Sequence, residues 1–294
     1  MTNYTYLQSV LDAQVVGDDG QEMKDLRAAR AEVEGLINIH FSGSSPTIRY
    51  GGSKAKGTMN LIDYDLDIIC YFPRGDTPAG KTIEEIYGNV KAALEKKYSV
   101  VPRTTALRIR DSKRDLHIDV VPGRFIDDTK TDAFVHQNGG DKSWLQTNLD
   151  EHVDYIRDSG CVPEIRLAKL WRHCAGVSVR TFPLELLVIK ILKSSNVAGL
   201  EKRFMRVLEE FRDNSRGLSI KDPANEGNDL SGALNASVCA ALSAAAAATL
   251  RTVANGGWEA VFDKVMASTE TVRSAALRTA IVTNPSRTQP WGIE

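Results

Sequence analysis

Tyr50-Gly-Gly-Ser-Lys-Ala-Lys-Gly-Thr58 is followed after a short gap by Asp63-Tyr-Asp-Leu-Asp67 and an apolar run that ends at Phe72. This pattern predicts a strand that enters a glycine turn, a short helix, and then a second, buried strand. Two adjacent glycines let the backbone approach a ligand closely, and the amides at a helix start point outward toward phosphate. Ser53 in this turn either caps the short helix or binds phosphate.

Two carboxylates, Asp65 and Asp67, stand two residues apart on the predicted strand, so both point to the same side. Like charges at the edge of an apolar strand are costly without a counter-cation. Two magnesium ions about 3.5–4 Å apart would satisfy both carboxylates and would bind a nucleoside triphosphate. Asp63 has the same parity, but it is expected to be a loop or capping residue. The alternative for the whole acidic run is a solvated strand end with turn aspartates.

A third carboxylate lies in the alternating segment Leu116–Val121, which is predicted to be a strand. Taken alone, Asp119 would face water at a sheet edge, and His117 is expected to be a surface histidine. If this strand neighbours the strand of Asp65 and Asp67, however, Asp119 completes a three-carboxylate site. It could then accept the proton of an attacking hydroxyl.

The charge balance argues against a protein held to nucleic acid or to an anionic membrane by bulk charge. The 294 residues include 37 Lys and Arg and 38 Asp and Glu, which gives a net charge of -1. The basic run Arg103, Arg108, Arg110, Lys113 and Arg114 has no interleaved aromatic residues, and its positive charge is diluted by Asp111 and Asp115. It is interpreted as a solvated hairpin face, with a place at the edge of a cleft as the second interpretation.

Cysteine spacing and hydropathy favour a soluble, cytoplasmic protein. The four cysteines lie far apart and form no CxxC pair, so neither a zinc site nor a disulfide framework is expected. The N-terminus lacks the basic and apolar regions of a signal peptide. The stretch Ala236–Leu250 is mostly alanine, which is too weakly apolar for so short a segment to span a bilayer. We interpret its part Ala241–Leu250 as a closely packed core helix, with an interaction module as the alternative, and expect no membrane partner.

The chain changes character about halfway, which predicts an α+β half followed by a helical half with a cleft between them. We place the division at 1–150 and 151–294 and expect an irregular tail over 283–294. Predicted strands are Thr47–Tyr50, Leu66–Phe72, Tyr98–Val101, Ala106–Arg110 and Leu116–Val121, and predicted helices are Gln21–His40, Thr82–Lys97, His152–Asp158, Pro163–Cys174, Phe182–Lys193, Leu200–Arg212, Leu230–Ala254 and Trp258–Ser268.

The Gly-Ser turn, the Asp-x-Asp pair and the distant Asp together resemble the polymerase-β-type nucleotidyltransferase superfamily. Landmarks in the second half narrow the resemblance to the cGAS/DncV-like nucleotidyltransferases (CD-NTases): Arg166–Arg172, Thr181–Leu186, Asp222–Asn225 and Trp258–Phe262. The resemblance spans most of residues 46–262. It implies a two-lobed α+β fold, in which a mixed-sheet nucleotidyltransferase core precedes an oligoadenylate-synthase-like helical domain and the active site lies in the cleft between them.

The resemblance also implies an activity. CD-NTases join ribonucleoside triphosphates, here ATP, GTP or both, into a cyclic di- or trinucleotide second messenger and release pyrophosphate. The bacterial members mostly serve in anti-phage defence (CBASS), where a downstream effector recognises the product. The zinc insertion with which animal cyclic GMP-AMP synthase binds duplex DNA is missing, so duplex DNA is not expected as an activator.

Two other functions fit the same residues. One is an enzyme that makes a linear 2′-5′ oligonucleotide or transfers a nucleotide to RNA, protein or a small molecule. The other is an inactive nucleotide-sensing protein of the same fold, which would be expected to have lost a carboxylate. All three carboxylates are present.

Individual residues inherit roles from the resemblance. Asp65, Asp67 and Asp119 match the catalytic carboxylates, which would hold two Mg²⁺ ions, with Mn²⁺ as a substitute. Gly52 and Ser53 resemble the triphosphate loop. Lys169 and Thr181 resemble the lysine and hydroxyl that hold the triphosphate from the helical lobe. The alternatives are a solvated lysine on a helix for Lys169 and a helix cap for Thr181.

Overall fold

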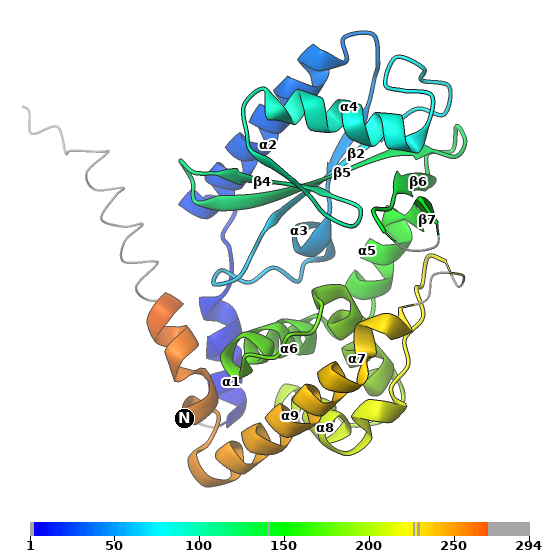
Figure 1. Cartoon of the computed structure of the whole chain (residues 1–294). Coiled ribbons are helices and arrows are strands. Elements are labelled where there is room, and N and C mark those ends of the chain that lie inside the picture. Colours follow the sequence, from blue (N-terminus) through cyan, green and yellow to red (C-terminus); the bar gives the residue numbers. More distant parts are fainter. Residues whose placement is uncertain (1–2, 140–141, 226, 228–229, 270–294) are drawn as a thin grey trace, which may run out of the picture.

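A computed structural model describes residues 3–139, 142–225, 227 and 230–269 and shows a sheet-based half above a helical half (Figure 1). The fold is α+β with a mixed sheet, as predicted. The sheet-based half contains α2 (Gln21–His40), α3 (Gly52–Lys56), α4 (Ile83–Glu95), β1 (Thr47–Tyr50), β2 (Leu66–Phe72), β3 (Val100–Pro102), β4 (Leu107–Asp111), β5 (Leu116–Phe125), β6 (Asp132–His136) and β7 (Trp144–Asn148).

The sheet runs in the order β1-β2-β5-β4-β3, and β6 continues from the far end of β5 to pair with β7. All neighbours are antiparallel except β2 and β5, which run parallel. The strand of Asp65 and Asp67 and the strand of Asp119 are therefore direct neighbours. This is the condition under which Asp119 joins the other two carboxylates.

Alternation along the strands separates the two faces of the sheet. Leu66, Ile68 and Cys70 of β2 pack with Ile118 and Val120 of β5 into an apolar cluster beneath α2 and α4. These two helices cover the sheet on the side away from the helical half (Figure 1). Residues of the opposite parity, including Asp67 and Asp119, consequently face the helical half.

The helical half forms its own apolar cluster, in which large aromatic side chains such as Trp171, Phe204 and Trp258 are fully buried. Its elements are α1 (Asn3–Ala13), α5 (Leu149–Arg157), α6 (Val162–Ala175), α7 (Thr181–Lys193), α8 (Leu200–Asn214), the short turns η1 (Ser215–Gly217) and η2 (Ser231–Leu234), α9 (Ala236–Gly256) and a helical stretch over 259–269.

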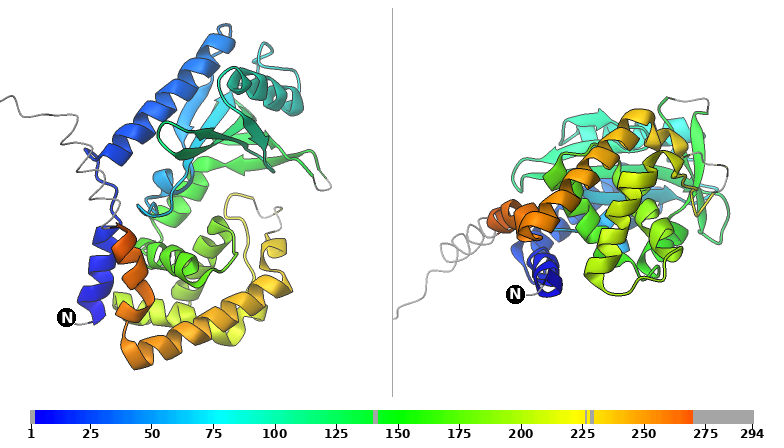
Figure 2. Two further views of the ribbon diagram at one scale, coloured as in Figure 1. Left: turned by 60° about the vertical axis from the view of Figure 1, so that its left-hand side comes forward. Right: turned by 90° about the horizontal axis from the view of Figure 1, so that it is seen from below.

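Helix α1 belongs to this cluster, although it precedes the sheet in the chain. Leu7 and Val10 are buried within it, and the Tyr6 hydroxyl donates to Asp263 at 3.2 Å. Figure 2 shows α1 beside the 259–269 stretch. The predicted division at residue 150 therefore needs a correction, because α1 packs with the helical half, whose core draws on both ends of the chain.

Helix α9 lies at the outside of the helical half and packs on α8 (Figure 2). Only one face is buried, through residues such as Leu242 and Ala246, so the expectation of a closely packed core helix is wrong.

By length and composition α9 could cross a membrane: its most apolar window has a mean hydropathy of 1.4, and 22% of that window is buried. The absence of a membrane partner stays a prediction.

The other predicted helices and strands are present: Gln21–His40, Thr47–Tyr50 and Leu66–Phe72 have the predicted bounds, and the rest have shifted ends. Helix α1 and strands β6 and β7 were not predicted from the sequence. All four cysteines are free thiols, as expected. The predicted irregular tail over 283–294 lies outside the described residues.

Candidate active site

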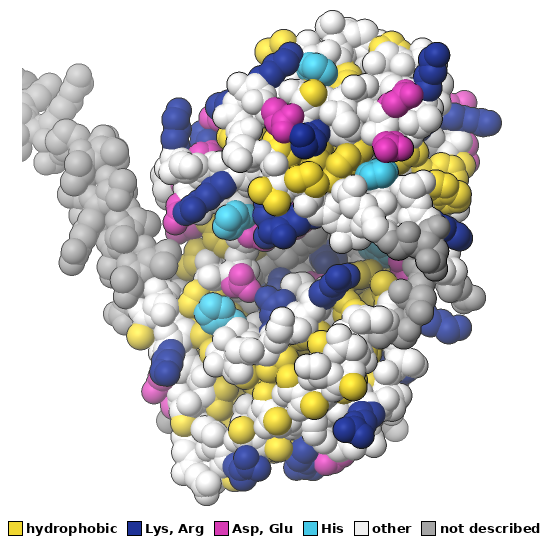
Figure 3. Space-filling model, viewed as in Figure 1, with side chains coloured by type: hydrophobic (Ala, Val, Ile, Leu, Met, Phe, Trp, Pro, Cys, Tyr) yellow, Lys and Arg dark blue, Asp and Glu magenta, His cyan; other side chains and the backbone are white. Residues whose placement is uncertain are grey.

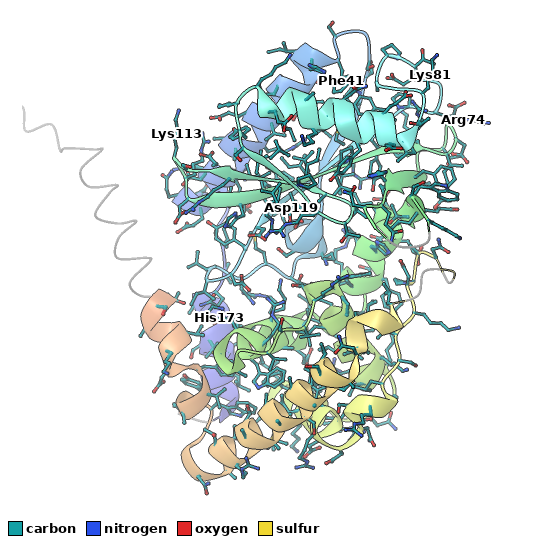
Figure 4. The ribbon with its side chains drawn as sticks, in the orientation of Figure 1. Phe41, Arg74, Lys81, Lys113, Asp119 and His173 are labelled. Atoms are coloured by element: carbon teal, nitrogen blue, oxygen red, sulfur yellow. The ribbon has the colours of Figure 1, made fainter. Side chains whose placement is uncertain are left out.

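Three carboxylates gather where the parallel strands β2 and β5 begin their shared ladder. Asp67 lies directly opposite Asp119 in the register, and Asp65 immediately precedes β2. Figure 4 labels Asp119 near the middle of the molecule, between the sheet and the helical half. The structure thus brings the predicted carboxylates together, which the sequence could propose only on the condition that the strands are neighbours.

The glycine turn lies against this cluster. The Gly51 amide donates to the Asp67 carbonyl at 2.9 Å, and Gly52 opens α3 with a φ of 50°. A Cβ atom at position 52 would overlap Oδ2 of Asp67. Glycine is therefore required here both for the backbone conformation and for the close approach to the carboxylate. Ser53, the next residue of α3, is half-buried beside it.

We expect Gly52→Ala to displace the Asp67 side chain, destabilise the protein by about 2–4 kcal/mol and abolish turnover. Gly57→Ala is the matched control, because Gly57 also has a positive φ, of 71°, but an added Cβ there meets nothing within 4 Å. It should cost only about 1 kcal/mol, through the backbone alone. Urea denaturation and a product assay measure both. Equal losses in the two variants would contradict the contact with Asp67.

Arg108 occupies the space between two of the carboxylates. Its Nε donates to Oδ1 of Asp119 at 2.8 Å, and its Nη2 donates to Oδ2 of Asp119 at 2.6 Å and to Oδ2 of Asp65 at 3.0 Å.

The interpretation of the basic run as a solvated face is therefore wrong for Arg108. It is also wrong for Arg114, which pairs with Asp111 and Glu32, whereas Arg110 is exposed as expected.

Burial raises the pKa of Asp67 to about 6, and the neighbouring charge of Asp119 acts in the same direction. Burial likewise raises the pKa of Asp65, which the Arg108 guanidinium partly offsets.

Carboxylate oxygens are the ligands that Mg²⁺ prefers, so the donor chemistry fits this cation. Among the described residues, however, no three such groups are arranged to hold a metal ion together. The Arg108 guanidinium stands between Asp65 and Asp119 instead.

Lys169 is not the solvated lysine of the alternative interpretation. Its side chain is buried on α6, where its Nζ donates to the Thr58 carbonyl at 2.8 Å. Burial lowers its pKa to about 8. Close by, the buried Glu185 of α7 accepts from Lys56 at the end of α3 and, at 2.8 Å, from the Thr58 hydroxyl. The end of the glycine turn is thereby fastened to two helices of the other half.

Thr181 is the first residue of α7, and the N-cap residue of this helix is Arg180, so the helix-cap alternative does not hold. The Thr181 hydroxyl accepts from Arg172 at 2.8 Å. Arg172 also donates to Asp63 at 2.9 Å, which fixes the turn before β2. Asp63 is therefore a turn residue, as predicted. His117 of β5, which was predicted to be a surface histidine, is exposed. The Thr181 hydroxyl keeps its own proton to donate to a ligand.

A cavity of about 790 Å³ lies between the sheet and the helical half. Ile69 and Val121 line it, each two residues beyond Asp67 and Asp119, so it begins about 6.6 Å along the strands from the carboxylates. The rest of its wall is largely aromatic and polar: Tyr71, Gln137, Trp144, Gln146, His152, Arg180, Phe182, Asp222 and Asn225. Figure 3 shows the hollow between the two halves, with Lys and Arg side chains along its edges.

Neither the place of Arg108 in the carboxylate cluster nor the buried Lys56–Glu185 pair was predicted from the sequence. For Arg108, the signal was the hairpin between Ala106–Arg110 and Leu116–Val121, because antiparallel pairing across the Asp111–Leu116 turn puts Arg108 opposite Asp119.

No family model matches the chain. The cyclic AMP-AMP-AMP synthase of Escherichia coli (strain MS 115-1) is 24% identical over 197 residues, or 60% of this chain and 59% of that protein. The chain therefore matches less than two thirds of this relative's length.

Solved structures are similar over most of the chain. CdnC of E. coli MS115-1 with ATP has a TM-score of 0.66 and 20% identity, over 89% of this chain and 98% of that chain. The Bradyrhizobium diazoefficiens CD-NTase CdnG with GTP has a TM-score of 0.69 and 13% identity, over 92% and 98%. This chain has the CD-NTase fold.

A third solved structure has a similar fold. The DncV cyclic AMP-GMP synthase of Vibrio cholerae, a prokaryotic cGAS homolog, has a TM-score of 0.61 and 16% identity, over 89% of this chain and 80% of that chain. The resemblance to the CD-NTases expected from the sequence is thus confirmed at the level of the fold.

Proposed function

We propose that this protein is a nucleotidyltransferase that joins ribonucleoside triphosphates into a cyclic di- or trinucleotide and releases pyrophosphate, in the cytoplasm and for anti-phage defence. The observation that carries the proposal is the pairing of Asp67 with Asp119, with Gly52 packed against Asp67 and Asp65 at the entrance of β2. The curated relative named as a cyclic AMP-AMP-AMP synthase and the ATP and GTP complexes of similar structures support it.

The cavity beside the carboxylates suits a nucleoside. Flat aromatic rings such as Trp144 and Phe182 offer stacking surfaces, and the side-chain amide of Gln137 offers a donor and an acceptor for a base edge. A base held there would leave its phosphates directed toward Asp65, Asp67 and Asp119. Gly52 and Ser53, which lie beside Asp67, would then meet the leaving phosphates through backbone amides and a hydroxyl.

The reaction needs positioning and charge balance. The acceptor hydroxyl oxygen forms a bond to the α-phosphorus of a triphosphate, the bond from that phosphorus to the bridging oxygen breaks, and pyrophosphate leaves. Asp119 would receive the proton of the acceptor hydroxyl. Divalent cations at Asp65, Asp67 and Asp119, Mg²⁺ or Mn²⁺, would neutralise phosphate charge and make the hydroxyl more acidic.

The helical half would act on the leaving phosphates from the other side. The Thr181 hydroxyl, held by Arg172, has a proton free to donate. The buried Lys169 is bonded to the Thr58 carbonyl, so its charge would favour phosphate while it holds the segment after the glycine turn in place. We expect no requirement for duplex DNA.

The test is mass spectrometry of the products formed by purified protein from all four ribonucleoside triphosphates with Mg²⁺ or Mn²⁺ and no DNA. A small, phosphatase-resistant product with stoichiometric pyrophosphate is expected. Asp119→Asn keeps the side-chain shape and should bind a non-hydrolysable triphosphate while making almost no product.

Other outcomes identify the alternatives. A phosphatase-sensitive ladder would indicate a linear oligonucleotide, and a nucleotide found on added RNA, protein or a small molecule would indicate a transferase. Nucleotide binding without pyrophosphate release under any condition would indicate a sensor. Near-normal product from Asp119→Asn would remove Asp119 from the site.

A further inference from the structure

Arg108 is a cation that contacts two of the three carboxylates of the cluster directly. Its guanidinium uses both oxygens of Asp119, at 2.8 and 2.6 Å, and one oxygen of Asp65, at 3.0 Å. The bidentate contact places the charge where the fork geometry of arginine is strongest. Direct pairing across the β4–β5 ladder fixes this position, because Arg108 and Asp119 are register partners.

This arrangement conflicts with a metal ion on the same carboxylates. A cation shared by Asp65 and Asp119 needs oxygens that Arg108 now binds, and it would stand within a few ångströms of another positive charge. The carboxylates are correspondingly not arranged to hold a metal ion together, within the part of the chain that the structure describes. Arg108 and a cation shared by Asp65 and Asp119 would therefore compete for the same oxygens.

We propose that Arg108 is a built-in competitor for the metal site: it holds Asp65 and Asp119 in the metal-free protein and must leave them before a divalent cation binds. The inference rests on the proposed function, from which the metal site comes. Arg108 thereby sets the concentration of divalent cation that the protein requires. It is a positioning residue, since it acts on the carboxylates that would hold the metal.

The test is the affinity of the nucleotide-free protein for Mn²⁺, measured by calorimetry and by the electron paramagnetic resonance of free Mn²⁺. We expect Arg108→Ala to bind Mn²⁺ about tenfold to hundredfold more tightly than the natural protein, the range that corresponds to one or two charge-assisted hydrogen bonds. The melting temperature of the metal-free variant should fall, and Mn²⁺ should raise it by more than it raises that of the natural protein.

Two further variants separate occupation of the site from a general charge effect. Arg110 lies on the same strand and face, but it pairs with the exposed Asp115 and not with the cluster. Arg110→Ala should leave the Mn²⁺ affinity within about twofold. Arg108→Lys keeps the charge without the fork and should give an intermediate affinity. This variant also provides the measurement if Arg108→Ala does not fold.

Failure of the inference and failure of the metal site give different results. If the natural protein binds Mn²⁺, Asp67→Asn loses that binding, and Arg108→Ala and Arg108→Lys bind like the natural protein, competition by Arg108 is excluded while the metal site stands. Equal tightening in Arg108→Ala and Arg110→Ala would also exclude it, in favour of a charge effect. If the natural protein, Arg108→Ala and Asp67→Asn show no difference in Mn²⁺ binding, the metal site itself is overturned, and the inference with it.

Discussion

Asp67→Asn is expected to lower the rate of nucleotidyl transfer by about three orders of magnitude or more while making the metal-free protein more stable at pH 7. The rate falls because asparagine keeps the shape of the side chain but removes a charge that faces Asp119 across the strand pair. The gain in stability arises because the native protein raises the pKa of Asp67 to about 6 through burial and the charge of Asp119.

The sign of the pH dependence follows from linkage. Between about pH 4 and pH 6 the native state holds the Asp67 proton more tightly than the unfolded chain does, so the contribution of Asp67 to the free energy of unfolding falls as the pH rises. Above about pH 6 the full destabilisation from the buried Asp67 charge is present. Asp67→Asn lacks this destabilisation. Its free energy of unfolding should exceed that of the natural protein by about 1–3 kcal/mol at pH 7 and should equal it below about pH 4.

Urea denaturation in the presence of a chelator, at several pH values, measures this difference, and the product assay measures the activity. Asp115→Asn is the matched control, because Asp115 is 81% exposed, pairs with Arg110 and has a φ of 50°, which asparagine tolerates. Asp115→Asn should change neither the free energy of unfolding nor the rate of nucleotidyl transfer appreciably. A less stable Asp67→Asn protein that retained activity would remove Asp67 from the carboxylate site.

Glu185→Ala is expected to destabilise the protein by about 3–5 kcal/mol, because it leaves the buried Lys56 ammonium and the Thr58 hydroxyl without their acceptor. The loss should also reduce turnover, since this contact fastens the end of α3 to α7. Glu95→Ala, which breaks an exposed pair with Lys91, should cost no more than about 0.5 kcal/mol.

A double variant tests the cause of the loss. Lys56→Met combined with Glu185→Gln removes both charges and keeps an acceptor for Thr58, so it should recover more than half of the stability lost in Glu185→Ala. Chemical denaturation of the three variants provides the comparison. If the double variant were as unstable as Glu185→Ala, the unpaired charge on Lys56 would not be the source of the loss.

Much of the sheet and of the carboxylate site could be predicted from the sequence, because both depend on local periodicity. The apolar run Leu66–Phe72 and the alternation in Leu116–Val121 identified the two strands, with Asp67 and Asp119 at polar positions within them. The short strands β6 and β7 were not found, because β7 has no buried residue and β6 is only five residues long, too short for its alternation to be distinctive. Helix α1 buries its apolar residues only against helices that follow much later in the chain.

The amino-acid sequence by itself determined the α+β order of the halves, the glycine turn and the position of each of the three aspartates in or beside its own strand, since each depends on neighbours within a few residues. Only the tertiary structure decided that Arg108 lies in the carboxylate cluster and that Lys169 is buried. A charged side chain is expected in water unless a partner compensates for its burial, and the partners of these two come from other elements: Asp119 and Asp65 for Arg108, and Thr58 for Lys169. Which charges are buried was therefore set by the pairing of β4 with β5 and by the contact of α3 with α6 and α7.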